Sequence, residues 1–309
     1  MIIFSKPNSY NLSDSIVTIG AFDGVHRGHV LVLNNLKFIA EQKGLQSVAV
    51  TFEEHPKHLY HPKEQFKLLS SKDEKIGLIR KTGIDALAFI SFDYRVSNMN
   101  YIDFIRNILI KKFYAKAILM GYDNHFGKGG EGSFKAVSEK SSELDVEVIQ
   151  IDELNPDDHI SSSKIRKSLV AGDIKTATRL LGYCYGFEAY VVKGNKIASE
   201  MGFPTANLML SCSEKIMPSF GVYATKAFFD NKLYHGILNY GIKPTVNKEI
   251  MEPIAELHIF NFSGNLYGKI VRVELVDKIR HEIKFDSIDE LKNQIVLDIQ
   301  QTNAILSNN

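Results

Sequence analysis

The first half of the chain alternates short apolar runs with longer amphipathic stretches. Residues 16–19 and 47–52 form apolar runs of strand length. Between them, apolar side chains recur at the spacing of one helical face: Val30, Leu33, Leu36 and Ala40. Because a strand, a helix and a second strand of this length form a βαβ unit, we predict parallel strands joined by a right-handed crossover. Further apolar runs follow at 86–92, 116–120 and 146–151, so the pattern predicts an α/β domain.

Polar and glycine-rich segments follow two of these predicted strands, at residues 21–29 and 121–132. Ligands of open α/β sheets bind beyond the carboxyl ends of the strands. We therefore expect the two segments to converge on one crevice.

The second half of the chain has the pattern of a mainly β domain. Two short helical stretches end near Leu181, and strand-like runs then follow at 221–229, 232–239, 254–260 and 269–276. In the last run Val271, Val273 and Leu275 alternate with polar residues, which is typical of a sheet with one solvated face. We predict a small barrel, and two domains that cover residues 1–182 and 183–309.

A final helix is predicted after the strands. Ser287 and Glu290 have the spacing of a capping box. An apolar stripe follows on one face: Ile288, Leu291, Ile295 and Ile299. We expect this helix to pack across the barrel.

Composition narrows the class of protein. Of 309 residues, 44% are hydrophobic and 24% charged, close to a soluble globular average. The 37 basic and 36 acidic residues do not form the footprint of a nucleic-acid binder. Two cysteines cannot build a disulfide framework, and Met1–Phe4 is too short for a signal-peptide core. We expect a cytoplasmic protein that acts on small molecules without nucleic-acid or membrane partners; a weak homo-oligomer stays open.

The segment Gly20–His29 has the features of a phosphate-binding loop. It lies between a predicted strand and helix, where backbone amides and the helix dipole favour an anion and glycines allow close approach. His26 and His29 can each donate a hydrogen bond to a phosphate whose negative charge grows during attack. An isolated pair of histidines is more often a solvated surface feature, but this context favours function. A zinc site is disfavoured because no third ligand has matching spacing.

A second run, Ser161-Ser162-Ser163 followed by Lys164 and Arg166, begins a predicted helix. Hydroxyls and cations there suit a leaving pyrophosphate. Taken alone, the serines are explained equally well as an N-cap.

Together these segments resemble the HxGH nucleotidyltransferase superfamily, and specifically the adenylyltransferase module of bacterial bifunctional FAD synthetases. Residues 18–29, the SSSKIR run, TFEEHP at 51–56 and GYDNHFG at 121–127 carry the resemblance. The sequence departs from the family pattern at Glu54, Asn124 and His125. The resemblance implies a Rossmann-like fold and nucleotide contacts at Gly20, Phe22, Asp23, Gly24, Gly28, Asp123, Ser161, Ser162, Ser163 and Arg166.

The barrel half contains a second candidate phosphate site. Thr205 and Asn207 place a hydroxyl and an amide oxygen two residues apart on a predicted strand, so both can face one magnesium ion. Neutral oxygens alone bind magnesium poorly, so ATP phosphates have to complete the coordination. Strand alternation puts Glu256 and His258 on one face, where Glu256 can accept a proton. On spacing alone, a solvated strand glutamate is the commoner explanation.

This half resembles riboflavin kinases. GFPTANL, GVYA, GILNYGIKPT, AELHIFNF and NLYG occur in the family's order. The resemblance implies a six-stranded barrel, Thr205 and Asn207 around Mg²⁺, Glu256 as base for the riboflavin 5′-hydroxyl, and nucleotide contacts at Gly194, Lys196 and Gly202. The sequence has Ala198 and Ser199 where the family has a Gly-Arg pair.

The combined expectation is a bifunctional enzyme. Its second half phosphorylates riboflavin to FMN with MgATP, and its first half adenylylates FMN to FAD with release of pyrophosphate. One alternative is an adenylyltransferase for another acceptor, such as a nicotinamide or pantetheine nucleotide. Another is a flavin-binding regulator with a decayed kinase site, suggested by Ser199 and the altered Asn124-His125 pair. A class I aminoacyl-tRNA synthetase is disfavoured, because no anticodon-binding domain or basic bias is evident.

Overall fold

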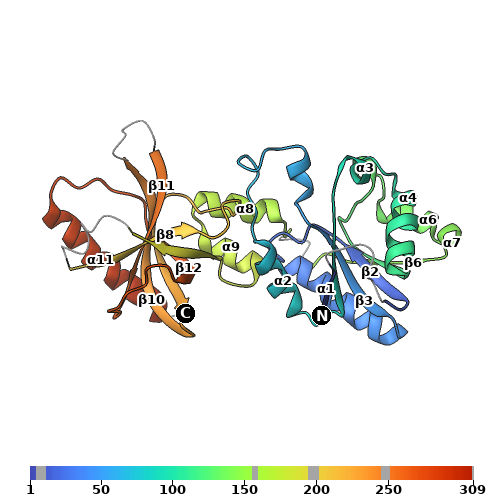
Figure 1. The fold of residues 1–309 in the computed structure, drawn as a ribbon, viewed down its shortest axis with the longest axis horizontal. Coiled ribbons are helices and arrows are strands. Elements are labelled where there is room, and N and C mark those ends of the chain that lie inside the picture. Colours follow the sequence, from blue (N-terminus) through green and yellow to red (C-terminus); the bar gives the residue numbers. More distant parts are fainter. Residues whose placement is uncertain (5–11, 155–158, 194–201, 245–250, 308–309) are drawn as a thin grey trace. The chain divides into compact units, whose positions relative to one another are not determined.

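The computed structural model describes residues 1–4, 12–154, 159–193, 202–244 and 251–307. They divide into two compact units, Met1–Ser162 and Ser163–Asn309 (Figure 1).

The first unit contains a six-stranded parallel sheet. Its strands lie in the order β1 (Ile2–Phe4), β4 (Ala86–Ile90), β3 (Gln46–Phe52), β2 (Ser15–Ile19), β5 (Ala115–Gly121) and β6 (Glu147–Ile151). The chain runs outward from β2 through β3 and β4, and then continues on the other side of β2 with β5. The boundary between β2 and β5 is therefore the topological switch point, where open α/β sheets bind ligands. The predicted α/β fold is confirmed; the short edge strand β1 was not predicted.

Helices cover both faces of this sheet. α1 (Arg27–Lys43) and α2 (Lys72–Arg80) pack on one face. The other face carries α3 (Tyr94–Ser97), α4 (Tyr101–Phe104), a π-helical segment (Ile105–Ile110), α5 (Lys111–Phe113), α6 (Phe134–Glu139) and α7 (Ser141–Leu144). Because both faces are covered, β2 and β4 are buried along their whole length. On α1, the predicted stripe is confirmed by the full burial of Leu33, Leu36 and Ala40.

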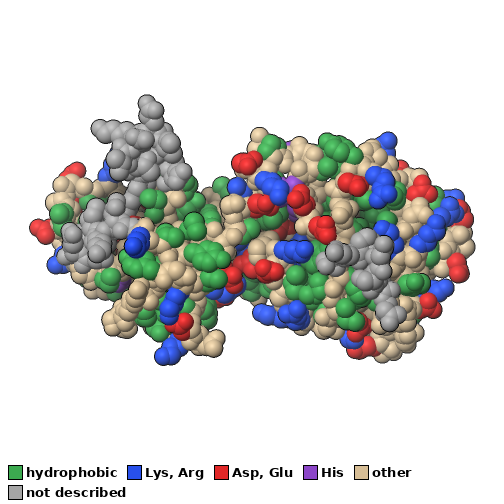
Figure 2. Space-filling view, viewed as in Figure 1, with side chains coloured by type: hydrophobic (Ala, Val, Ile, Leu, Met, Phe, Trp, Pro, Cys, Tyr) green, Lys and Arg blue, Asp and Glu red, His purple; other side chains and the backbone are tan. Residues whose placement is uncertain are grey.

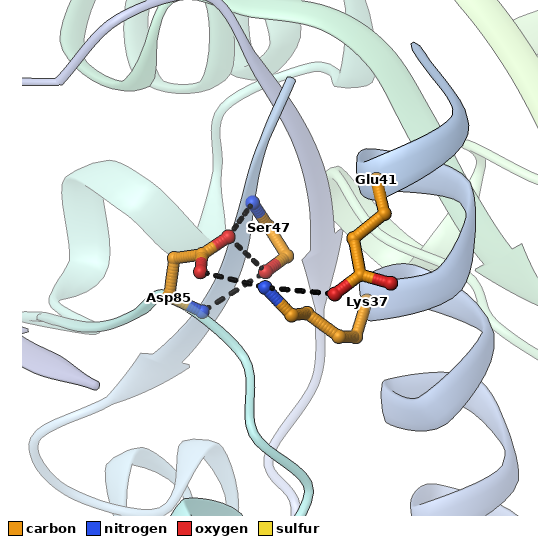
Figure 3. A network of polar contacts seen from close by, with 4 residues as sticks. All are labelled: Lys37, Glu41, Ser47 and Asp85. Atoms are coloured by element: carbon orange, nitrogen blue, oxygen red, sulfur yellow. Dashed lines mark hydrogen bonds and ion pairs between the residues drawn. The ribbon is translucent and has the colours of Figure 1, made fainter. Parts of the chain in front are cut away.

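A polar network pins the amino ends of β3 and β4 to α1 (Figure 3). The Asp85 carboxylate accepts hydrogen bonds from the Ser47 N–H at 2.9 Å, the Ser47 hydroxyl at 2.6 Å and the Lys37 ammonium at 2.9 Å. Lys37 also lies 3.3 Å from the Glu41 carboxylate. Burial alone would raise the pKa of Asp85, but the bonds from Ser47 and Lys37 outweigh it and hold the pKa below its usual range. This network lies at the opposite end of the strands from the switch-point crevice.

The second unit is built on a closed antiparallel barrel in the described residues. Its strands follow the order β10 (Lys232–Pro244), β11 (Met251–Ile259), β8 (Thr205–Leu210), β7 (Gly186–Val192), β12 (Ile270–Arg280) and β9 (Gly221–Phe229). On β12, Val271, Val273 and Leu275 are fully buried while Arg272 and Glu274 are partly exposed, as their alternation predicted. The unit also contains α8 (Ser162–Ala171), which starts at the unit boundary, and α9 (Ile174–Leu181). The predicted barrel is confirmed.

The last helix, α11 (Ile288–Ser307), packs against β9, β10 and β12, as predicted. Its Ser287 hydroxyl accepts the Glu290 N–H at 3.2 Å, but the Glu290 carboxylate bonds to the Asp286 N–H, so only half of the capping box forms. The predicted stripe is wrong at Ile288, which is 66% exposed.

The buried positions of α11 are Asp298, Thr302 and Leu306, all in its second half. Ile288 is about five turns before Leu306 and therefore on the same face, but it lies in the exposed first turn. Asp298 accepts a forked ion pair from Arg280 of β12, with Nε–Oδ1 at 2.9 Å and Nη2–Oδ2 at 2.8 Å. A paired, hydrogen-bonded carboxylate of this kind can be buried.

Candidate functional site

A cavity of about 300 Å³ lies at the carboxyl ends of β2, β5 and β6. The loop after β2, the loop after β5 and the segment after β6 all contribute to its wall. Its lining includes Gly20, Phe22, His26, Gly28, His29, Tyr122, Asp123, Asn124, His125, Glu153, Ser161 and Ser162. The predicted convergence of two loops on one crevice is thus confirmed, and the crevice lies at the switch point.

The loop after β2 is held in an unusual backbone conformation. Phe22 and Val25 have φ angles of 46° and 37°, in the left-handed region that non-glycine residues rarely occupy. Both side chains are buried, at 3% and 1% exposure. Such strain persists only where the surroundings over-determine it, and it is commonest at functional sites.

Two glycines make room for the aromatic side chains of this loop. A Cβ atom on Gly20 would lie 3.1 Å from the Phe22 ring, and a Cβ on Gly28 would lie 3.3 Å from two atoms of the His26 ring. Because glycine has no Cβ atom, the Phe22 and His26 rings can pack against the backbone at these two positions. The sequence predicted only that the glycines allow a phosphate to approach.

His26 and His29 stand together at the start of α1. The helix begins at Arg27, with His26 as its N-cap, so His29 lies in the first turn rather than before the helix. The His26 Nδ1 atom accepts the His29 backbone N–H at 3.4 Å, and the two imidazole rings stack with centroids 3.6 Å apart. Backbone N–H groups of a first turn have no acceptor within the helix. The two rings and this turn form the donor-rich wall of the cavity.

Both imidazoles are neutral near pH 7. Burial lowers the pKa of His26 to about 4, although Asp23 opposes the shift. Burial, with the neighbouring His26 and Lys75, lowers the pKa of His29 well below its usual value. Because the His26 Nδ1 is an acceptor, its proton is on Nε2, which can donate to a ligand. A bound polyphosphate would favour the charged form and raise both pKa values.

Asp23 does not line the cavity, although it was predicted to contact the nucleotide. Its buried carboxylate accepts the backbone N–H groups of Leu69 at 3.0 Å and Ser70 at 3.1 Å. The Gly24 N–H in turn donates to the Ser70 hydroxyl at 3.0 Å. Asp23 and Gly24 therefore tie the loop to a segment about fifty positions away.

The same segment continues into α2, which supplies a buried lysine. The Lys75 ammonium donates to the carbonyl oxygen of Ala21 at 2.8 Å. This segment was not predicted to belong to the site. Its one local signal is the capping box of Ser71 and Glu74, which starts α2 and forms both of its bonds.

The loop after β5 is anchored by one of its departures from the family pattern. The Asn124 amide donates to the Ile19 carbonyl at the end of β2, at 2.7 Å, and the His125 Nδ1–H donates to the Asp123 carbonyl at 2.9 Å. Asn124 thus joins the ends of β2 and β5 on either side of the switch point. Asp123 lines the cavity, as its predicted contact with the nucleotide requires.

The remaining wall comes from the segment before α8. Ser161 and Ser162 line the cavity, and the Ser162 hydroxyl donates to the Asp23 carbonyl at 3.0 Å. Ser163 and Arg166 lie further along α8, in the second unit. Beside the cavity, the Tyr122 hydroxyl is hydrogen-bonded to His159, and His159 Nδ1 lies 2.7 Å from the Glu153 carboxylate. Burial and the neighbouring Glu153 raise the pKa of Tyr122 to about 12.

In the second unit, the predicted kinase residues fall in register on adjacent strands. Glu256 of β11 pairs with Asn207 of β8 on one side and with Asn239 of β10 on the other. Thr205 pairs with His258 in the same two strands. Directly opposed residues share one face of a sheet with Cβ atoms about 5 Å apart, so Thr205, Asn207 and Glu256 form one polar group. Glu256 is only 9% exposed.

The turn before β8 is fixed by His258. Its Nδ1–H donates to the Pro204 carbonyl at 2.8 Å, and its ring meets Phe203 edge-on with centroids 5.9 Å apart. Gly202 has a φ of 89°, which only glycine adopts readily. The predicted nucleotide contacts Gly194 and Lys196, and the departures Ala198 and Ser199, lie outside the described residues.

The donor set around Thr205 fits magnesium brought by ATP. Within the described residues, no group of three or more His, Cys, Asp or Glu side chains could hold a metal ion. The Thr205 hydroxyl and the Asn207 amide oxygen are hard, neutral ligands of the kind that leaves most of the magnesium coordination to phosphate and water.

Comparison with known proteins covers both units. A family model described as FAD synthetase matches residues 8–165, and one described as Riboflavin kinase matches residues 181–306. A bifunctional riboflavin kinase/FMN adenylyltransferase of Buchnera aphidicola is 38% identical over 93% of both chains. The protein of the same name from Bacillus subtilis is 36% identical over 95% of this chain and 93% of that one.

A solved structure also matches along the whole chain. The crystal structure of a protein named Macrolide-efflux Protein, from Streptococcus pneumoniae, has a TM-score of 0.89 and 30% identity, over 98% of this chain and 99% of that one. None of the helices in the described ranges combines the length and the apolar character needed to cross a membrane.

Proposed function

This chain belongs to the family of bifunctional riboflavin kinases/FMN adenylyltransferases, and from that premise we propose which of its residues carry each reaction. The enzyme phosphorylates riboflavin to FMN with ATP and adenylylates FMN to FAD with release of pyrophosphate. The observation that carries the assignment is the pair of stacked histidines on a strained loop, facing a cavity at the switch point of the first unit.

In adenylyl transfer, an oxygen of the FMN phosphate attacks the α-phosphorus of ATP. The bond between the α-phosphorus and the bridging oxygen breaks, and pyrophosphate leaves. His26 and His29 donate hydrogen bonds where negative charge grows on the α-phosphate. A neutral imidazole has one N–H, so each ring can still donate one hydrogen bond to the ligand. The other predicted nucleotide contacts are assigned two roles. Residues of the loops after β2 and β5 are proposed to bind the phosphates of ATP: Gly20, Phe22, Asp23, Gly24, Gly28 and Asp123. Residues before and on α8 are proposed to bind the leaving pyrophosphate: Ser161, Ser162, Ser163 and Arg166.

In phosphoryl transfer, the riboflavin 5′-hydroxyl oxygen attacks the γ-phosphorus of ATP and ADP leaves. Glu256 accepts the hydroxyl proton, which its position in register with Asn207 and its low exposure support. Thr205 and Asn207 would hold magnesium, which would neutralise charge on the ATP phosphates. Gly202, and Gly194 and Lys196 outside the described residues, are proposed to contact the nucleotide.

Reciprocal variants test these roles. We expect His29→Ala to lower FMN adenylylation by about 100- to 1,000-fold, because one preorganised donor is lost, while riboflavin phosphorylation is unchanged. Glu256→Gln should lower riboflavin phosphorylation by about 100- to 10,000-fold while added FMN is still adenylylated.

The measurement is a time course with MgATP and either riboflavin or FMN, with riboflavin, FMN and FAD resolved by chromatography. Each variant serves as the control for the other, since each leaves the opposite site intact. Equal loss of both activities in either variant would contradict separate sites, and full phosphorylation by Glu256→Gln would remove that residue from its role.

The partners and location of the enzyme are also proposals. We propose that it acts in the cytoplasm on free small-molecule substrates, without nucleic acid or membrane, and at most as a weak homo-oligomer. The unpaired cysteines Cys184 and Cys212 support a reducing compartment. On the face shown in Figure 2, basic and acidic side chains are interspersed, which disfavours a phosphate backbone as a partner there. Cell fractionation and sedimentation of the purified protein test these statements.

A further inference from the structure

We propose that Lys75 is a positioning residue for adenylyl transfer: its ammonium group holds the loop after β2 in the conformation that points His26 and His29 into the cavity. The proposal rests on the function assigned above to the two histidines. It adds a residue from α2, a helix outside the segments that carry the family resemblance.

The first support is a direct contact. Lys75 is 9% exposed, and its Nζ atom lies 2.8 Å from the carbonyl oxygen of Ala21. Ala21 lies between Gly20 and Phe22, at the point where the backbone enters its left-handed conformation. An ammonium group is costly to bury and is found inside proteins only where it is paired. Here the hydrogen-bonded partner is the loop backbone itself.

The Ala21 carbonyl does not depend on Lys75 alone for a hydrogen-bond donor. The Ala21 oxygen also accepts the Thr51 hydroxyl of β3 at 3.2 Å, so it would stay hydrogen-bonded without the lysine. A charged donor makes a shorter and stronger bond than a hydroxyl. Lys75 therefore supplies restraint on the loop beyond the satisfaction of one buried acceptor.

Lys75 acts together with a second set of bonds on the same loop. Asp23 accepts the N–H groups of Leu69 and Ser70, and Gly24 donates to the Ser70 hydroxyl. These bonds and the Lys75 bond hold three of four successive loop positions, 21, 23 and 24, from the segment 69–75. The strain at Phe22 lies inside this clamp, as expected if the clamp over-determines it.

The charge of Lys75 also affects the pKa of His29. Burial lowers the pKa of Lys75, while Asp23 opposes the shift. Lys75 contributes, after burial and His26, to the lowered pKa of His29. The charged and titratable groups that act on the histidine pair are thus Asp23, Lys75 and His159, together with the pair itself. Lys75 does not line the cavity, so its influence on the substrate passes through the loop and these rings.

The same helix provides a matched control. Lys72 lies one turn before Lys75, but its ammonium group stands over the Phe89 ring, 4.6 Å from the centroid, in a cation–π contact. Lys72→Met and Lys75→Met remove the same charge and the same atoms from one helix. Only the second removes a bond to the loop.

The experiment measures kcat and the KM for ATP in FMN adenylylation. Riboflavin phosphorylation by the same preparations is the internal reference. The variants are Lys75→Met, Lys75→Gln, Lys75→Arg, Lys72→Met and His29→Ala. Misplacement of catalytic groups by about 1 Å can cost about 100-fold in rate. We expect kcat to fall by about 10- to 100-fold in Lys75→Met, with KM changed by less than about threefold. The kcat of Lys75→Gln should lie between those of Lys75→Met and the unmodified enzyme. Lys75→Arg keeps a charged donor, so its kcat should be higher than that of Lys75→Met.

Several results would overturn the proposal. One is adenylylation by Lys75→Met within about twofold of the unmodified enzyme, or an equal loss in Lys72→Met. Parallel loss of both activities in Lys75→Met and Lys75→Gln would reduce Lys75 to a structural residue. If instead His29→Ala keeps its adenylylation activity, the function proposed for the cavity fails, and that outcome is separate from any result at Lys75.

Discussion

The two units hold their catalytic groups in different ways. In the first unit, His26 and His29 are stacked on a strained loop in a cavity, and a segment about fifty positions away holds that loop. In the second, Thr205, Asn207 and Glu256 lie in register on neighbouring strands of a barrel. A loop site depends on tertiary contacts that set its backbone and protonation, whereas a strand site is positioned by the ladder that forms the fold. The two sites should therefore respond differently to substitution, pH and metal.

The largest effect we expect is a loss of stability in the second unit alone. Asp298→Ala leaves the partly exposed Arg280 without its forked partner and should destabilise the second unit by about 3 kcal/mol. In a urea titration, riboflavin phosphorylation should then be lost at a lower urea concentration, while FMN adenylylation persists. Asp289→Ala, at an exposed position in the first turn of the same helix, is the matched control. If both activities disappear together in Asp298→Ala, the units unfold as one and the comparison breaks down.

A pH dependence should belong to the first unit. The pKa of His26 is lowered to about 4 from 6.5, so between these values the folded protein binds fewer protons than the unfolded chain. The contribution of neutral His26 to stability is therefore complete above pH 6.5 and decreases as the pH falls toward 4. The expected loss for His26 is about 2 kcal/mol by about pH 5.

Urea unfolding of the first unit at neutral pH and at about pH 5 measures this loss. His26→Asn keeps an acceptor at the N-cap but removes the titrating ring, so its stability should depend less on pH. His61→Asn, at an exposed site in the same unit, should behave like the unmodified protein. An unchanged pH dependence in His26→Asn would show that His26 is not buried in its neutral form.

The same contrast explains how far the sequence could predict the molecule. Strands buried on both faces appear as continuous apolar runs, and the one-sided stripe of α1 follows from its spacing, so the α/β unit was predictable. The alternation of Val271, Val273 and Leu275 likewise predicted the barrel. Ile288 lies on the predicted face of α11 but in its exposed first turn, and the point along the helix at which burial begins is set by the barrel, which the helical spacing does not reveal.

The candidate sites divide in the same way. The spacing of His26 and His29, and the alternation around Glu256, indicated both sets of residues without tertiary information. Lys75 could not be found, because its bond to Ala21 joins segments more than fifty positions apart. The protonation of the histidines also depends on burial that only the fold creates. Asp23 stays a prediction as a nucleotide contact, and its carboxylate is engaged by Leu69 and Ser70.

The metal requirement should distinguish the second unit. Asn207→Ala removes one of two neutral oxygens proposed for magnesium, so riboflavin phosphorylation should need about tenfold more Mg²⁺, equivalent to about 1.4 kcal/mol. The measurement is a Mg²⁺ titration at constant ATP. FMN adenylylation by the same variant serves as its control and should keep its original Mg²⁺ dependence. A parallel shift in both titrations would mean that Asn207 acts on overall stability and not on the metal.

The smallest effect concerns the network at the amino ends of β3 and β4, far along the strands from the cavity (Figure 3). Asp85→Asn removes a charged acceptor shared by Ser47 and Lys37, and should cost about 1 kcal/mol, because the group is partly exposed and screened by solvent. Glu41→Gln removes the same charge from the other side of Lys37, where an exposed helical pair contributes about 0.3–0.5 kcal/mol. Denaturant titrations should rank the two variants in this order, with kcat unchanged for both reactions. A fall in adenylylation by Asp85→Asn would contradict the division of the sheet into a stabilising end and a catalytic end, because the strands themselves would then transmit the change to His26 and His29.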